Sequence, residues 1–323
     1  MTAAPIRLGF VPLNDAAPLI VAQARGCFAA EGLAVELERQ VSWATLRDKL
    51  ALGVIDGAQM LGPAALAAAL GLGGGHTAPL VAPLALNRGG PGVTLSARLV
   101  DALGPQPDAA ALGRLVARRR AAGASPLTLA VVFPYSTHNY LLRDWLAAAG
   151  LEPDRDLRLT VAAPSRMNEL LARAVVEGFA AGEPWNSAAE AAGAGRVVLR
   201  SAEAPDKVLA VREAWAEAHP GRLQALLRAL ARAAAWADQA ENRHALAALL
   251  AREEHVGAPA PVIAAGLAGM RFSGRAARPD PADAEWLLRQ MQRWGHAPAD
   301  LDVAQAARRV YRADLHAAAA AHG

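Results

Sequence analysis

Hydrophobic and polar positions alternate between two spacings over the first ninety residues. Four short runs are apolar or alternating, which is typical of strands: 6–13, 33–40, 55–61 and 79–87. Between them lie three stretches with apolar positions at helical spacing: 17–28, 42–53 and 62–73. Ser42 fits a helix N-cap and Gly53 a helix C-terminus. This order predicts a mostly parallel sheet flanked by helices.

A glycine-rich turn at 87–92 precedes a second series of the same kind. Its predicted helices and strands are 108–122, 127–133, 136–150, 157–163, 165–176 and 196–201. After about residue 205 one more strand is followed only by helices rich in Ala and Arg, which lack the strands for a sheet of their own. We therefore predict two α/β lobes with a ligand cleft between them, the first made of 1–90 and 203–323 and the second of 91–202.

The composition of the 323-residue chain excludes several classes of protein. Ala supplies much of the 54% hydrophobic content, and no run approaches the roughly 20 apolar residues that span a bilayer, so no membrane insertion is expected. The net charge of +3 is mild and spread out, so direct nucleic-acid binding is not expected. A single cysteine, Cys27, excludes disulfide frameworks. The N-terminus has no secretory signal, which predicts a cytoplasmic protein unless a signal was trimmed.

Standard catalytic and cofactor-binding motifs are absent from the sequence. The chain contains no GxGxxG, GxxxxGK[ST], HExxH, CxxC or GxSxG. The glycine-rich run 70–76 follows a helical pattern instead of a strand, which argues against a dinucleotide site. We therefore expect neither an enzyme nor a bound cofactor or metal.

Two candidate ligand-binding side chains fall where predicted strands give way to helices. Trp43 lies in the first turn of a predicted helix, where free backbone N–H groups attract anions and an indole offers a flat wall and an N–H. A core tryptophan is the alternative. His138 also lies in a first helical turn, where its imidazole is expected to stay neutral and donate one N–H. A structural histidine is the alternative there.

A turn and a lysine complete the candidate site. The segment GFAAGEPWNS (178–187) is predicted to be a turn in which Gly182, beside Glu183, lets a ligand approach backbone N–H groups. Lys49 and Lys207 are the only lysines in an Arg-rich chain, and Lys207 lies at the predicted return crossing between lobes. Its ammonium is predicted to point into the cleft, with an isolated surface lysine as the alternative. N–H donors, one cation and an aromatic wall, without an acid–base pair, favour binding of a small monoanion over a reaction.

Five segments then resemble one known family: GFVPLNDAAPLIVAQARGCFAAEGL, SWATLRDKLALGVIDGAQML, FPYSTHNYLLRDWLAAAG, GFAAGEPWN and KVLAVREAW. In this order they resemble the nitrate and bicarbonate solute-binding proteins of ABC transporters. The resemblance implies the type II periplasmic-binding-protein fold, in which two α/β lobes close on a ligand. It also implies a nitrate pocket made by Trp43, His138, the backbone at Gly182 and Lys207.

One pocket position departs from that family. Where the transporter proteins carry a glutamine in an Asn-rich turn, this chain has Pro91, which cannot donate a side-chain hydrogen bond. Gln59, at the end of a neighbouring predicted strand, is expected to compensate.

Within this superfamily, the missing signal and the run ALGLGGG resemble most the cytoplasmic NasS-type nitrate/nitrite sensors. This resemblance implies a protein partner, an RNA-binding antiterminator of the NasT type, that is released when nitrate or nitrite closes the lobes. Two alternatives stay open. One is the substrate-binding component of an ABC transporter for nitrate, bicarbonate, a sulfonate or a pyrimidine; the other is an enzyme on the same fold, with His138 as the candidate base.

Overall fold

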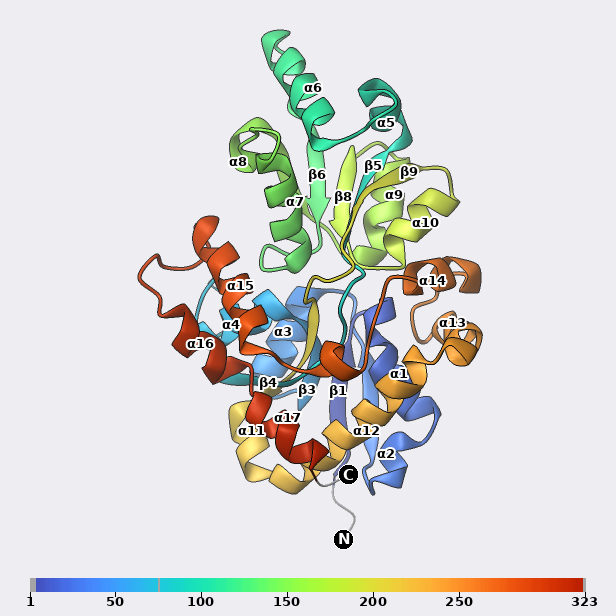
Figure 1. The fold of residues 1–323 in the computed structure, drawn as a ribbon, viewed down its shortest axis with the longest axis vertical. Helices are drawn as coiled ribbons and strands as arrows, with labels where there is room; N and C mark the ends of the chain where they lie inside the picture. Colours follow the sequence, from blue (N-terminus) through green and yellow to red (C-terminus); the bar gives the residue numbers. More distant parts are fainter. Residues whose placement is uncertain (1–3, 75, 322–323) are drawn as a thin grey trace.

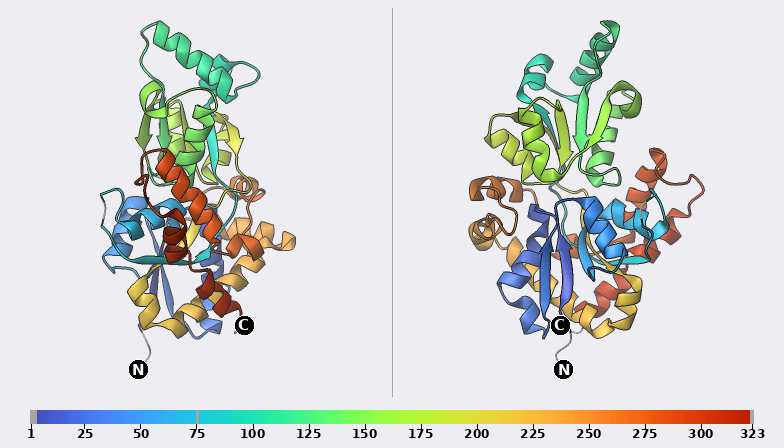
Figure 2. Two further views of the ribbon diagram at one scale, coloured as in Figure 1. Left: turned by 60° about the vertical axis from the view of Figure 1, so that its left-hand side comes forward. Right: turned by 180° about the vertical axis from the view of Figure 1, so that it is seen from behind.

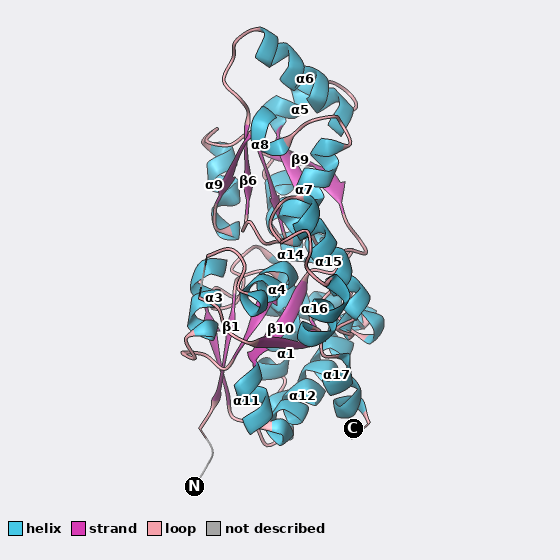
Figure 3. Cartoon of the chain, turned by 90° about the vertical axis from the view of Figure 1, so that its left-hand side faces the viewer, coloured by secondary structure: helices cyan, strands magenta, loops and turns pink. Residues whose placement is uncertain are grey.

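Two stacked lobes, each built on a five-stranded sheet, make up the chain in a computed structural model (Figure 1). The structure describes residues 4–74 and 76–321. Residues 1–3, Gly75 and 322–323 lie outside the described residues, and with them the ends of the predicted first lobe and one glycine of the run 70–76. Figure 3 shows both sheets as layers with helices packed against them, which is the α/β architecture that the sequence predicts.

The first sheet has the strand order β2-β1-β3-β10-β4. Its strands are β1 (Ile6–Phe10), β2 (Val35–Arg39), β3 (Gly57–Leu61), β4 (Leu80–Ala85) and β10 (Lys207–Arg212). β1 pairs in parallel with β2 and β3, whereas β10 runs antiparallel to β3 and β4. Lys207 therefore pairs with Leu61, the last residue of β3, so β10 begins at the edge where the parallel strands end.

The second sheet has the strand order β7-β6-β8-β5-β9. Its strands are β5 (Gly92–Ser96), β6 (Thr128–Val131), β7 (Arg158–Val161), β8 (Gly178–Ala181) and β9 (Gly195–Arg200). β6 pairs in parallel with β7 and β8, and β5 runs antiparallel to β8 and β9.

The prediction of mostly parallel sheets is confirmed for strand direction, because in each sheet four of the five strands that the structure describes point the same way. In each sheet one strand, β10 or β5, is antiparallel to both of its neighbours. These are the strands that the chain enters directly after crossing from the other lobe. Strand–helix alternation predicts parallel pairing only within a βαβ unit, and a strand reached by a crossing is free of that constraint.

Helices cover both sheets. Those of the first lobe are α1 (Ala17–Ala24), α2 (Cys27–Ala30), α3 (Trp43–Ala51), α4 (Gly62–Leu70), α11 (Glu213–Ala218), α12 (Pro220–Asp238), α13 (Arg243–Leu250), α14 (Ala260–Leu267), α15 (Pro281–Arg293), α16 (Val303–Val310) and α17 (Ala313–Ala320). Those of the second are α5 (Ala97–Leu103), α6 (Ala109–Ala121), α7 (Thr137–Ala147), α8 (Pro153–Asp156), α9 (Met167–Ala172) and α10 (Trp185–Ala191). Across the described residues, none of the helices combines the length and the apolar character needed to cross a membrane.

The C-terminal helices pack on the first sheet. Leu226 and Leu230 of α12 share an apolar cluster with Leu8 of β1, and Leu287 of α15 shares another with Met60 of β3. Figures 1 and 2 show α14 and α15 on opposite sides of the junction between the lobes. Burying a leucine side chain contributes about 2 kcal/mol, so these helices are part of the first lobe's core and not an appendage.

The two chain segments that connect the lobes are hydrogen-bonded to each other. Leu86 N–H donates to Lys207 O at 2.8 Å, Gly89 N–H to Ala204 O at 3.2 Å, and Ser201 N–H to Pro91 O at 3.0 Å. This paired ribbon, which we call the hinge, connects the two lobes, and Lys207 lies at its end in the first lobe.

Candidate functional site

Two helix N-termini, one from each lobe, meet at the junction. Trp43 is the first residue of α3, whose N-cap Ser42 Oγ accepts from Thr45 N–H at 3.2 Å. His138 is the second residue of α7, whose N-cap Ser136 Oγ accepts from Asn139 N–H at 3.1 Å. The predicted first-turn positions of Trp43 and His138 are therefore confirmed. Both side chains are also buried, as the alternatives of a core tryptophan and a structural histidine require.

Lys207 lies between these helices. Its side chain has no exposed surface, and its Nζ is 5.5 Å from the centroid of the Trp43 ring, within cation–π range. The surface-lysine alternative is therefore wrong. His138 Nε2 lies 3.7 Å from Asp206 Oδ2, and the Lys207 ammonium donates to that same oxygen. The first residue of β10 thus brings a cation to the two helix N-termini.

Gly182 closes the site from the second lobe. A methyl group placed on it would lie 2.8 Å from Leu13 Cδ2, 3.3 Å from His138 Nε2 and 3.4 Å from Asp15 Oδ2. The segment 178–187 is only partly the turn that the sequence predicts: Gly178–Ala181 forms strand β8, and α10 begins at Trp185. The Gly182 backbone therefore faces the cluster from the end of a strand, with the side chains of Leu13, His138 and Asp15 packed against it.

Gln59 of β3 reaches the same cluster through Asp15. Its Nε2 donates to Asp15 Oδ1, while its Oε1 accepts from Val11 N–H at 2.7 Å. Both of its polar atoms are thus used within the first lobe. Gln59 orients Asp15 with one of its two Nε2 hydrogens, and compensation for the family glutamine by the other hydrogen stays a prediction.

Two carboxylates were not predicted from the sequence. Asp15, in the short helical turn Asn14–Ala16, places Oδ2 3.1 Å from Lys207 Nζ, and Asp206, the residue just before Lys207, accepts a hydrogen bond from the same ammonium. Both side chains are about 1% exposed. The expected set of N–H donors, one cation and an aromatic wall therefore lacked these two carboxylates. The adjacency of Asp206 and Lys207 in the sequence was the available signal.

Burial and charge shift the pKa of three groups in the cluster. Burial raises the pKa of Asp15 to about 6, with Lys207 opposing the shift and Asp206 adding to it. Burial lowers the pKa of His138 to about 3, against the attraction of Asp206. For Lys207 burial disfavours the charge, but Asp15 and Asp206 outweigh it and raise the pKa. At neutral pH the imidazole is neutral and the ammonium is charged.

Several polar atoms of this cluster have no hydrogen-bond partner among the described residues. They are Trp43 Nε1, both ring nitrogens of His138 and Asp206 Oδ1. Buried polar groups are rarely left unpaired, because each lost hydrogen bond costs about 1–3 kcal/mol. Their convergence at one place between two lobes is typical of groups that a polar ligand completes.

The remaining candidates lie elsewhere. The Glu183 side chain accepts from Ser187 N–H at 3.0 Å and pairs with Arg200, so it is not brought to the cluster. Burial raises the pKa of Glu183, and Arg200 opposes that shift. Pro91 lines a cavity of about 410 Å³ together with Glu183 and Arg200. The adjacency of Glu183 to Gly182 misled the prediction, since successive residues at a strand end point to opposite sides.

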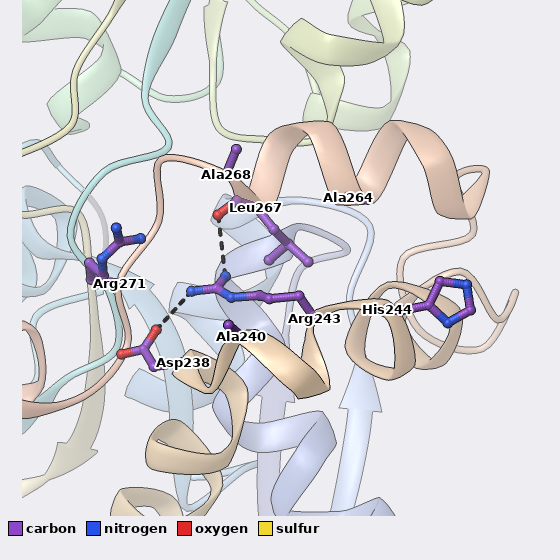
Figure 4. A pocket seen from close by; sticks show the side chains of 8 residues that line it. All are labelled: Asp238, Ala240, Arg243, His244, Ala264, Leu267, Ala268 and Arg271. Carbon is purple, nitrogen blue, oxygen red and sulfur yellow. Dashed lines mark hydrogen bonds and ion pairs between the residues drawn. The ribbon is translucent and has the colours of Figure 1, made fainter.

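A larger surface groove lies away from this cluster, between α13 and α14 (Figure 4). It measures about 550 Å³ and includes Asp238, Arg243 and Arg271 in its lining. Arg243 donates to Asp238 at 3.0 Å and to Leu267 O at 3.2 Å, and Figure 4 shows both contacts. Arg243 and Asp238 therefore already bond each other in this groove.

Within the described part of the chain, no group of three His, Cys, Asp or Glu is placed to hold a metal ion.

Comparison with known proteins agrees with this architecture. Residues 2–251 match the model of the NMT1-like family. The chain belongs to this family, whose members include solute-binding proteins of ABC transporters. The crystal structure of the periplasmic nitrate-binding protein NrtA from Synechocystis PCC 6803 superposes with a TM-score of 0.92 at 31% identity, covering 98% of this chain and 88% of NrtA. The predicted periplasmic-binding-protein fold is thereby confirmed.

Sequence comparison with curated proteins also finds relatives named for nitrate binding or import. The chain is 32% identical to the nitrate/nitrite binding protein NrtA of Synechocystis over 96% of its length and 74% of the relative's. It is 35% identical to the nitrate import ATP-binding protein NrtC of Synechococcus elongatus over 98% of its length, but it spans only 50% of that relative. The chain thus spans about half the length of the first curated relatives that it matches. Kinship with binding proteins also supports the prediction that it is not an enzyme.

Likeness to other structures shows the fold alone. The alkanesulfonate-binding protein SsuA from Xanthomonas axonopodis pv. citri, bound to MOPS, superposes with a TM-score of 0.72 at 17% identity, covering 95% of this chain and 98% of SsuA. The chain therefore shares its scaffold with proteins that hold quite different ligands.

Proposed function

We propose that this protein binds a small monoanion, nitrate or nitrite, between its lobes and serves as the substrate-binding component of an ABC transporter. One observation carries the proposal: unpartnered N–H donors of Trp43 and His138 converge on the buried ammonium of Lys207. A planar anion among them would receive hydrogen bonds from an indole, an imidazole and an ammonium. The relatives named as nitrate-binding proteins support this ligand class.

Calorimetric titration with nitrate, nitrite, bicarbonate and sulfate tests the proposal. Nitrate or nitrite is expected to give a saturable heat of binding and sulfate none. Replacing Lys207 with Ala should weaken the binding at least about tenfold, because it removes the cation that the anion faces. Lys49, the other lysine, provides the matched control, since it pairs with Glu38 at 2.9 Å on the surface of the first lobe. Lys49→Ala should leave the affinity unchanged.

Trp43→Phe provides a second test of the site if the Lys207→Ala variant does not fold. It keeps an aromatic ring beside the ammonium but removes the Nε1 donor, and should weaken binding about fivefold, the equivalent of one hydrogen bond of about 1 kcal/mol. Unchanged affinity in both Lys207→Ala and Trp43→Phe would refute the assignment of the pocket.

A second candidate function is the cytoplasmic NasS-type sensor that the sequence resembles, with an antiterminator of the NasT type as partner. The chain aligns with about half the length of proteins named as ATP-binding proteins of nitrate import and bicarbonate transport. Proteins that bind ATP work where ATP is present, and this favours a cytoplasmic role. Lobe closure on nitrate would then change a partner surface. Co-purification with a NasT-type protein, present without nitrate and lost with it, would favour the sensor. Stimulation of a permease's ATPase activity would favour transport.

A further inference from the structure

The cluster around Lys207 holds more negative than positive charge. One ammonium faces two carboxylates, those of Asp15 and Asp206, and the neighbouring His138 is neutral. With both carboxylates ionised, the cluster therefore carries a net charge of −1 before a ligand arrives. A monoanion would raise this to −2 in a site with almost no exposed surface, where like charges repel strongly.

The elements packed around the pair offer little compensation. β3 contributes the neutral amide of Gln59, and α7 contributes the neutral His138. Tyr311, buried beyond Asp206, keeps its proton, because burial and then the charges of Asp283 and Asp206 raise its pKa. Arg88 is engaged in its own ion pair with Asp283. The N-termini of α3 and α7 each add about half a positive charge, which offsets the existing excess and leaves nothing for an added anion.

The hydrogen-bond inventory shows the same mismatch. Asp206 Oδ1 is buried and accepts no hydrogen bond from any described residue. Nitrate and nitrite offer only acceptors, so an oxygen of either ion facing Asp206 Oδ1 would meet another acceptor. A proton placed between the two oxygens removes the repulsion and supplies the missing bond.

We propose, on the basis of the function proposed above, that Asp15 and Asp206 form a proton-holding pair that determines specificity, so that each monoanion binds together with one proton from solvent. The proton resides on the pair, keeps the charge of the occupied site at −1 and turns an acceptor into an O–H donor toward the ligand. A dianion such as sulfate would require a second proton, and the site excludes it.

The pair is suited to this exchange near neutral pH. Burial, ahead of the opposing Lys207, raises the pKa of Asp15 to about 6, so the empty site is mostly deprotonated above that pH and can take up a proton when an anion enters.

Calorimetry across a pH series tests the proposal. The nitrate affinity of the unaltered protein should fall toward about tenfold per pH unit above about pH 6, as linkage to one proton requires. Titrations in buffers of different ionisation enthalpy should show uptake of nearly one proton per nitrate at about pH 7.5. Asp206→Asn should abolish both effects, since its amide oxygen can still accept from Lys207 while its NH₂ replaces the proton. Asp101→Asn, at an exposed position on α5, is the control and should behave as the parent protein does.

Two results would overturn the proposal. One is nitrate binding with the same affinity from about pH 6 to 8.5 and no proton uptake, which leaves the proposed function intact. The other is an Asp206→Asn variant that binds nitrate with the parent's pH slope. If Asp206→Asn does not fold, the proton count of the unaltered protein decides alone. If folded protein binds neither nitrate nor nitrite at any pH, the proposed function fails and this inference fails with it.

Discussion

His138 is buried at the lobe junction, and neither of its ring nitrogens is hydrogen-bonded to a described residue. Burial lowers its pKa from the ordinary 6.5 to about 3. In the unfolded chain the imidazole takes up a proton near its ordinary pKa. Below about pH 6.5 the unfolded state therefore binds more protons than the folded state, and this residue reduces the free energy of unfolding as the pH falls.

This shift predicts how a His138→Asn variant differs from the parent protein. The difference in unfolding free energy should change by up to about 1.4 kcal/mol per pH unit below about pH 6.5, with the parent losing stability relative to the variant. The raised pKa of Asp15 acts in the opposite direction, but it is common to both proteins and cancels in the difference. Urea denaturation at several pH values measures the effect, and His244→Asn, at an exposed position on α13, is the control. A difference that does not vary with pH would contradict the burial of a neutral imidazole.

At this scale the sequence revealed part of the site. Trp43, His138, Gly182 and Lys207 stand out as rare or strand-edge residues, and the structure places them together. The two carboxylates at Lys207 were missed because acidic residues are common on surfaces, and only three-dimensional packing shows that these two are buried. Whether the cluster holds nitrate stays a prediction.

Among the elements, α7 has the most consequence for the site, because its first turn carries His138. Ser136 fixes this turn in two ways: its Oγ accepts from Asn139 N–H and donates to Phe133 O at 2.7 Å. The hydroxyl thus ties the start of the helix to the end of the preceding strand region.

Ser136→Ala should cost about 1–2 kcal/mol of unfolding free energy and also weaken nitrate binding several-fold, because the turn that aims His138 is loosened. Thermal unfolding and calorimetric titration measure the two effects. Ser96→Ala is the matched control: Ser96 caps α5 through Leu99 N–H at 3.2 Å, away from the junction. It should lower stability without changing affinity, and an Ser136→Ala variant with full affinity would contradict a positioning role.

Element prediction succeeded where hydrophobic periodicity was strong. Strands β1, β2, β3 and β4 lie within their predicted ranges, and Ser42 caps α3 as predicted. β5 and β8 were missed, since GVTLS and GFAA contain small residues that resemble turn sequences. Tertiary pairing, β5 lying between β8 and β9, makes strands of these segments despite weak local preference.

Across the whole molecule, the two lobes touch well beyond the hinge. Trp185 Nε1 donates to Pro12 O at 3.2 Å, and Asn14 N–H donates to Glu183 O at 2.9 Å. Away from the hinge, Asp144 of α7 accepts from Gln290 of α15 at 2.8 Å and from Arg293 at 2.9 Å. Helix α15 of the first lobe is therefore bonded directly to helix α7 of the second lobe.

Asp144→Ala should shift the unliganded protein toward more open arrangements, because it removes both bonds between α7 and α15. The expected cost is about 1 kcal/mol, or a several-fold loss of nitrate affinity, since Asp144 is partly exposed. Small-angle X-ray scattering should show a larger radius of gyration without nitrate and compaction when nitrate is added. Asp101→Ala, on the outer part of the second lobe, controls for loss of a charge. Equal radii of gyration for parent and variant would show that the bonds of Asp144 to α15 do not hold the lobes together.

The burial of Lys207 and its neighbours also affects how fast a bound ion could dissociate. An ion held among side chains with almost no exposed surface has no direct exit while the lobes touch, so its departure waits for them to part, a domain motion of microseconds to milliseconds. Ligands that differ widely in intrinsic affinity would then dissociate at similar rates, because lobe opening limits each of them. The lifetime of the complex would be a property of the hinge more than of the ion it holds.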